Sequence, residues 1–357
     1  MSAPNLFSFA TSELSQDAVL AWLLAWADPV HKADPVHEKG SMHAVGSAFL
    51  GSLLALSADE HVRSGAVTSV NVRRQAGRVD VRADVWLSGV DRPVAVLIED
   101  KVLTGVHDDQ LNRYLDETLV DTAIEAVVPV YLTTHNAAEL PNTVGGRWVA
   151  FERSDLLRVL TSGAARHVRN DILDAFREHL TRIEAESAAY ATTDPGAWNA
   201  AAWRGYFTAL TAEIGTRTPA EAVEPPSWSY VPNKAGGFWA LWWGVATVPD
   251  GWLYLQLEGK PATASRTASA LLSFRVRCGH GETAARRDFR KMWHRRLSDA
   301  ADAAGFGVSA PSRFGSGAAM TVAVASGDRA WCGAPEQDAV TLVDAWHVAA
   351  AAARLHR

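Results

Sequence analysis

The alternation of apolar and polar residues is clearest between residues 79 and 101, where it predicts a β-hairpin. In Val79–Leu87 the odd positions are apolar and most even positions are charged, so the two sets fall on opposite faces of a strand. The run Val94–Ile98 is apolar throughout, as expected of a strand buried on both faces. Ser88–Arg92 lies between them and contains a glycine and an aspartate, which favour a tight turn.

Further elements follow from the same patterns in the first half of the chain. Serines that can cap helices precede apolar residues at helical spacing, and short β-branched runs indicate more strands. The expected helices are Ser12–Trp26, Ser41–Leu56, Asp108–Leu119 and one capped by Ser154, and the expected strands are Ala66–Arg73, Val79–Leu87, Val94–Ile98, Ala126–Thr133 and Arg147–Phe151. Helix, strands, helix and strand in this order predict an α/β domain.

The second half predicts a different domain. A long charged helix at Arg166–Glu186 is followed by a linker signal at Thr192–Gly196 and by three prolines within Arg217–Pro226. We therefore expect an α/β domain at residues 1–190, a helical linker at 191–226 and a tryptophan-rich α+β domain at 227–357. The last of these contains strand-like runs at Gly237–Val245, Gly251–Leu257, Ala268–Cys278 and Ala319–Ala325, with helices at Ala284–Ala304 and Glu336–Leu355.

Composition narrows the class of protein. The chain has 357 residues, 48% hydrophobic and 21% charged, which is typical of an ordinary globular protein with two domains. Its two cysteines suggest neither a disulfide framework nor a zinc site, and the apolar run Ala18–Ala27 is too short to span a bilayer, so a cytoplasmic protein without membrane contact is expected. A net charge of −6 argues against a protein that coats nucleic acid, but it permits a local basic surface.

The candidate chemistry lies where the predicted buried strand ends in Glu99-Asp100-Lys101. Glu99 and Lys101 project to one face and Asp100 to the other. Hairpin pairing could bring an aspartate of the preceding strand close to Glu99, and both Asp80 and Asp84 point the same way. Two carboxylates and an ammonium are the groups that magnesium-dependent phosphodiester cleavage needs. The alternative is a strand that simply emerges into solvent.

Asp84, Glu99-x-Lys101 and Gln110-x-x-x-Tyr114 together resemble the D…E-x-K…Q-x-x-x-Y signature of the PD-(D/E)XK nuclease superfamily. The likeness covers about residues 10–160. It implies a restriction-endonuclease-like core, with the order α-β-β-β-α-β and a mixed central sheet flanked by helices. Asp84 is preferred over Asp80 because it fits the R-x-D-hydrophobic pattern and lies nearer the turn; Asp80 could pair with an arginine or assist.

The resemblance also implies roles for these residues. Asp84 and Glu99 would bind one or two Mg²⁺ ions, for which Mn²⁺ would substitute, with the backbone carbonyl of Asp100 as a further ligand. Lys101 would position the attacking water. Glu13, in the first predicted helix, would complete the metal shell or merely favour the helix N-terminus. Gln110 and Tyr114, on one helix face, would support the site and approach the DNA backbone. Relatives often carry asparagine where this chain has Asp100.

Two further features concern nucleic acid and metal. The predicted helix at 284–304 is strongly basic, and its side chains could grip phosphates while Trp293 stacks on bases; the alternative is a solvated helix face. The basic residues are Arg286, Arg287, Arg290, Lys291, Arg295 and Arg296. Tyr230–Trp243 is interpreted as core packing rather than a base-stacking platform. The repeated ADPVH segments carry His31 and His37, interpreted as an exposed loop rather than a metal site.

The sequence thus predicts a Mg²⁺-dependent nuclease, acting on DNA in bacterial defence, restriction or repair. An inactive nuclease-fold binding or scaffold protein and an RNA-cleaving toxin are the alternatives. A homo-oligomer or a partner protein is compatible with either.

Overall fold

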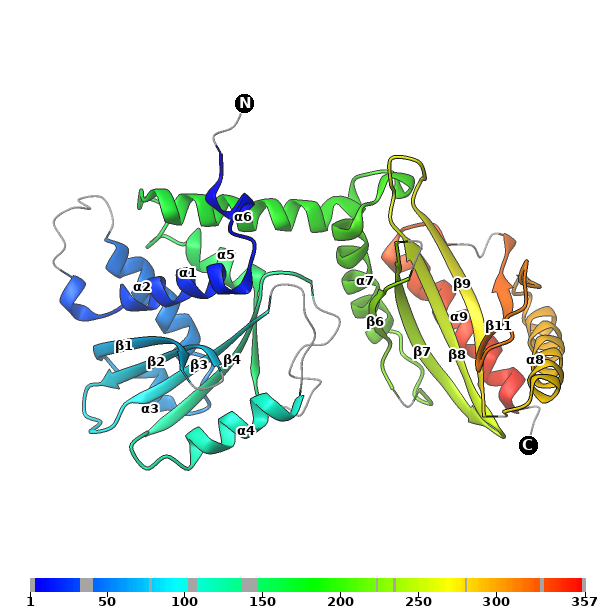
Figure 1. The fold of residues 1–357 in the computed structure, drawn as a ribbon, viewed down its shortest axis with the longest axis horizontal. Helices are drawn as coiled ribbons and strands as arrows, with labels where there is room; N and C mark the ends of the chain where they lie inside the picture. Colours follow the sequence, from blue (N-terminus) through cyan, green and yellow to red (C-terminus); the bar gives the residue numbers. More distant parts are fainter. Residues whose placement is uncertain are drawn as a thin grey trace. The chain divides into compact units, whose positions relative to one another are not determined.

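The computed structural model describes residues 4–32, 41–76, 79–101, 108–136, 147–222, 224–233, 236–279, 281–327 and 331–354. The chain divides into two compact units, Met1–Ala185 and Glu186–Arg357, each with its own sheet. The protein is therefore of mixed α/β class (Figure 1). Over the described ranges, every helix is too short or too polar to cross a bilayer.

The first unit is built on a five-stranded mixed sheet with the order β1-β2-β3-β4-β5. Its first three strands pair antiparallel, and β3, β4 and β5 pair parallel. The strands are β1 (Val67–Ala76), β2 (Val79–Leu87), β3 (Val94–Lys101), β4 (Ala126–Thr133) and β5 (Val149–Glu152). The predicted hairpin is β2 and β3, and α4 (Asp108–Leu119) connects the parallel pair β3 and β4.

Helices cover both faces of this sheet (Figure 1). The larger core joins one face to α1 (Glu13–Ala25), α2 (Met42–Leu54), α5 (Arg153–Leu160) and α6 (Asp171–Ala188). A smaller core on the other face includes residues of α4. The remaining helical segments of this unit are α3 (Glu60–Ser64) and the 3-10 turns Leu6–Ser8 and Pro29–His31. Burial on both faces accounts for the apolar run of β3.

Helix α1 is polar in its first turns and apolar from Ala18 to Ala25, and two of its polar residues are buried. Ser12 caps it, with its side chain accepting the Ser15 amide at 3.3 Å. Leucines dominate its buried surface, yet Gln16 and Asp17 are also buried. Since buried polar groups need hydrogen-bond partners, these two residues indicate a polar cluster beneath the helix.

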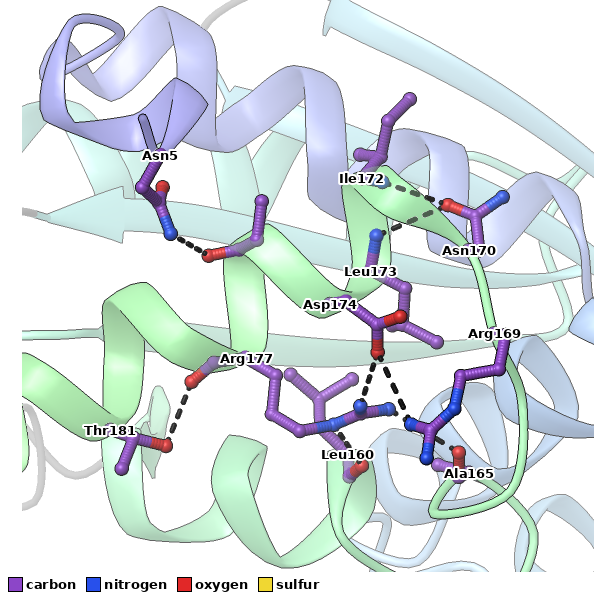
Figure 2. Close-up of polar contacts among 11 residues, drawn as sticks. Asn5, Leu160, Ala165, Arg169, Asn170, Ile172, Leu173, Asp174, Arg177 and Thr181 are labelled. Atoms are coloured by element: carbon purple, nitrogen blue, oxygen red, sulfur yellow. Dashed lines mark hydrogen bonds and ion pairs between the residues drawn. The ribbon is translucent and has the colours of Figure 1, made fainter. Parts of the chain in front are cut away.

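Helix α6 is tied to the first unit by side chains (Figure 2). Asn170 accepts the amides of Ile172 and Leu173, so the helix begins at Asp171 rather than near Arg166 as predicted. Arg177 donates to the carbonyl of Leu160 at 2.9 Å. The side chain of Asn5 donates to the carbonyl of Ala175 at 2.9 Å, which fastens the N-terminal segment to the same helix.

The second unit carries an antiparallel sheet of six strands in the order β10-β11-β9-β8-β7-β6. The strands are β6 (Ser227–Val231), β7 (Phe238–Val248), β8 (Gly251–Lys260), β9 (Ser269–Cys278), β10 (Val308–Ser309) and β11 (Ala319–Ala325). The helices are α7 (Ala200–Gly215), α8 (Thr283–Ala304) and α9 (Pro335–Arg354), with 3-10 turns at Ala189–Ala191 and Pro195–Ala197. The α+β prediction with an antiparallel sheet agrees with this arrangement.

The predicted helical linker at 191–226 is part of this second unit. Trp203 and Tyr206 of α7 are fully buried and contact the rings of Trp198 and Trp331. The Tyr206 hydroxyl donates to Asp338 in α9 at 2.8 Å. Aromatic burial on this scale holds α7 in the core, so the segment does not act as a separate linker.

Candidate active site

The register of the β2–β3 hairpin decides which aspartate lies beside Glu99. Val81 pairs with Ile98 and Asp84 pairs with Ala95, so Asp80 lies opposite Glu99 one step beyond the last pair. The carboxylate of Asp80 accepts the backbone amide of Asp100 at 2.8 Å, which fixes it at the end of β3. Asp80 is therefore the aspartate that the fold brings to this strand end.

Asp84, preferred from the sequence, lies elsewhere. Its carboxylate is bound by Arg82 at 2.7 Å and by Arg73, and it is buried. Asp84 follows Asp80 by four residues along β2, which is roughly 13 Å at strand spacing, so its carboxylate does not join Glu99 and Lys101. One feature of the sequence favours Asp80 as the partner of Glu99. The two residues are about equally far from the turn at residue 90, as opposite positions of a hairpin are.

Lys101 joins the acidic side chains of the strand end. Its ammonium lies 2.6 Å from a carboxylate oxygen of Glu99 and 4.0 Å from Asp80. Burial alone would lower the pKa of Lys101, but the hydrogen bond to Glu99 and the charges of Glu99, Asp80 and Glu13 raise it. Lys101 is therefore an ammonium at neutral pH.

Glu99 has the most perturbed carboxylate on this face. Burial raises its pKa to about 7, Lys101 opposes the shift, and the charges of Asp80 and Glu13 add to it. Burial likewise raises the pKa of Asp80, against the Asp100 amide and Lys101, with Glu13 contributing. Glu13, in the first turn of α1, thus acts electrostatically on the same group of side chains, and the place in a metal shell that the resemblance implies for it stays a prediction.

The side chain of Asp100 points to the opposite face, as strand alternation predicts. It accepts a hydrogen bond of 2.6 Å from the Gln16 amide, and Gln16 in turn accepts from Thr134 at 3.0 Å. Burial and the nearby charge of Asp17 raise the pKa of Asp100 well above its usual range. Because this side chain faces away from Glu99 and Lys101, only the backbone carbonyl of Asp100 is left as the implied metal ligand.

Asp17 was not identified from the sequence. Burial and the charge of Asp80 raise its pKa to about 6, and both of its carboxylate oxygens are buried without a hydrogen-bond partner. The polar cluster continues through Arg153, which donates to the carbonyl of Thr134 and to Glu184 of α6, each at 2.7 Å. Asp17 lies on α1 and the neighbouring Asp100 on β3, and no pattern in a single sequence indicates that two such residues are close.

Of the Q-x-x-x-Y pair, Tyr114 has a described side chain; Gln110 lies in α4, but its side chain is outside the described residues. Tyr114 is buried in the small core and its hydroxyl hydrogen-bonds with Arg82. It therefore supports the Arg82–Asp84 pair rather than Glu99 and Lys101. Residues 102–107 and His37 also lie outside the described residues.

The side chains at this strand end can be compared with those that a bound Mg²⁺ ion needs. Among the residues that the structure describes, no three acidic, histidine or cysteine side chains gather closely enough to hold an ion. The donor chemistry nevertheless suits Mg²⁺, since the side chains of Asp80 and Glu99 and the backbone carbonyl of Asp100 are all oxygen donors. One buried oxygen of Glu99 has no hydrogen-bond partner, and so offers a lone pair.

The predicted nucleic-acid side chains of α8 divide into two groups. Arg290 donates to the Gly315 carbonyl and lies 4.9 Å from the ring of Phe314, while Arg296 lies 5.4 Å from the ring of Trp293. Trp293 is fully buried, so the predicted stacking of Trp293 on bases is wrong. Arg286 is half-buried. The exposed basic residues are Arg287, Lys291 and Arg295, four residues apart on one helix face.

No protein-family model, curated protein or solved structure matches the chain. The nuclease resemblance therefore depends on the motif residues and on the geometry around them.

Proposed function

We propose that the protein is a Mg²⁺-dependent nuclease with a restriction-endonuclease-like first unit, and that Asp80, Glu99 and Lys101 form its reactive centre. The observation that carries the proposal is the convergence of these three side chains at the ends of β2 and β3. The element order, three antiparallel strands followed by a helix and a parallel strand, supports it. The substrate we propose is DNA, in a bacterial defence, restriction or repair setting.

The acidic and basic side chains of the site have different proposed roles. Asp80, Glu99 and the Asp100 carbonyl would hold Mg²⁺, which when bound supplies Lewis-acid stabilisation of the phosphate and a more acidic water. Glu13 adds negative charge near these residues. Lys101 remains an ammonium and can orient the attacking water and stabilise negative charge on the phosphate oxygens. In hydrolysis the water oxygen bonds to phosphorus, the bond to the leaving oxygen breaks, and the water loses a proton.

Plasmid cleavage tests the proposal. Purified protein should nick or degrade plasmid with Mg²⁺ or Mn²⁺ and not with EDTA, and Lys101→Ala should reduce the rate roughly 100-fold or more. Lys32→Ala, which removes an exposed lysine to which no role is assigned, is the matched control and should retain wild-type activity.

Matched DNA and RNA substrates separate the possible outcomes. Cleavage of RNA alone would replace the DNA assignment with an RNA-cleaving effector. Absence of metal-dependent cleavage of both substrates would mean an inactive fold used for binding, and the proposal would be lost.

A further inference from the structure

The two faces of the second unit's sheet differ in what covers them. On one face Trp243 contacts Trp346 of α9, and Trp228 stacks on Phe207 of α7. In Figure 1, α9 runs behind β7 and β8. The opposite face carries the alternate residues of the same strands, and two of its large apolar side chains, Trp252 and Leu271, are each 42% exposed. We call this surface the open face.

The open face carries aromatic rings, one of which packs on a glycine. Trp252 packs on Gly244, where an added Cβ would be 3.0 Å from the indole ring. Tyr254 follows two residues later on β8, so its ring is about 7 Å further along the same face. Trp242 is opposite Gln256, and its indole N–H donates to that side chain at 2.8 Å. The polar edge of Trp242 is thus satisfied while part of its ring stays accessible.

The charge of the open face is opposite in sign to that of the whole chain. Arg275 lies 5.9 Å from the ring centre of Tyr254 and 3.7 Å from Glu258. Arg277 is exposed and pairs with Trp252 in the strand register. The face therefore combines an exposed arginine, Arg277, and a half-buried one, Arg275, with the partly exposed rings of Trp252 and Tyr254, although the chain has a net charge of −6. Such a surface complements a polyanion that also has flat apolar groups.

We propose that the open face, centred on Trp252, Tyr254, Arg275 and Arg277, binds single-stranded nucleic acid. Bases stack on the two rings, and the two arginines contact phosphates. A duplex hides its bases and offers only phosphates, so it gains nothing from the rings. A neutral polysaccharide could stack on the rings but gains nothing from the arginines. The inference goes beyond the nuclease proposal and does not depend on cleavage.

Binding in EDTA tests this surface without cleavage. Fluorescence anisotropy with labelled dT20 and rU20 gives the affinity for single strands, and a 20-base-pair duplex gives the comparison. We expect Trp252→Ala and Arg277→Ala each to weaken single-strand binding at least about fivefold, the lower end of the loss for one stacked base. Base stacking should also quench tryptophan fluorescence in the wild type and less in Trp252→Ala. The ratio of the affinities for dT20 and rU20 shows which of the two strands is preferred.

Tyr230→Ala is the matched control, because Tyr230 is 44% exposed in the same sheet but contacts Trp239 on the helix-covered face. It should bind like the wild type. A combined Arg287→Ala, Lys291→Ala and Arg295→Ala variant tests the basic face of α8 instead. The inference is overturned if neither oligonucleotide binds, if only the α8 variant loses affinity, or if Trp252→Ala and Arg277→Ala bind like Tyr230→Ala. Since Lys101→Ala should bind normally, failure of single-strand binding is distinguishable from failure of the nuclease proposal.

Discussion

Asp80 and Asp84 lie on one face of one strand, yet their surroundings differ completely. Asp84 is held by two guanidinium groups and supports local structure. Asp80 shares a single ammonium with Glu99 and lies near Glu13, so its pKa is raised by burial and by a like charge. A compensated carboxylate stabilises the fold, whereas clustered acids cost stability and are common where a cation or a reaction requires them.

The largest effect we expect separates the two aspartates by activity. Asp80→Asn should lower metal-dependent cleavage roughly 100-fold or more, because it removes a charged oxygen donor from the reactive centre. Asp84→Asn should stay within about tenfold of wild type, assayed well below its unfolding temperature. Plasmid-cleavage rates measure both. The reverse order of losses would restore Asp84 as the reactive aspartate.

The next effect concerns stability and separates the two arginines that bind Asp84. Asp84→Ala leaves Arg82 mostly buried without its partner, and we expect a loss of about 3 kcal/mol in the free energy of unfolding. Arg73→Ala, whose side chain is 50% exposed, should cost below about 1 kcal/mol. Urea unfolding of the variants measures both losses. Equal losses would show that the inner arginine is not the important partner.

The acid pair beneath the site should destabilise the fold at high pH. Because the pKa of Asp17 is raised from 3.8 to about 6, the folded state binds the proton more tightly than the unfolded state. This contribution is complete below pH 4 and is lost as the pH rises through 6. Asp17→Asn should therefore be more stable than wild type by up to about 3 kcal/mol at pH 8, with no gain at pH 4. Thermal unfolding across this range measures the difference, and a pH-independent gain would contradict the titration of Asp17 as its cause.

The smallest effect concerns the tyrosine that supports Asp84. Tyr114→Phe removes its hydrogen bond to Arg82 and should cost about 1 kcal/mol with unchanged cleavage. Unfolding and cleavage measured on the same variant distinguish a structural role of Tyr114 from a role at the reactive centre. A large fall in cleavage with unchanged stability would place Tyr114 in the reaction instead.

The hydrophobic pattern alone was sufficient for most elements. The strands at 79–87 and 126–133 and the helix at 108–119 follow from period and turn residues, because burial imposes those patterns locally. The strand predicted at 94–98 extends to Lys101. Helix ends were less accurate. The helix expected to be capped by Ser154 begins at Arg153, where Asp155 accepts the amide of Glu152, and such local competition between polar side chains is hard to rank.

Other properties required the tertiary structure. Whether Asp80 or Asp84 meets Glu99 depends on hairpin register, and a shift of a few residues preserves the pattern while changing the partner. The burial of Trp293 and the membership of α7 in the second unit depend on aromatic contacts between distant segments. The sequence by itself determined which strand end carries the charged groups and which face each one takes. Only the tertiary structure decided their partners, because those lie on other strands and helices whose approach no local pattern encodes.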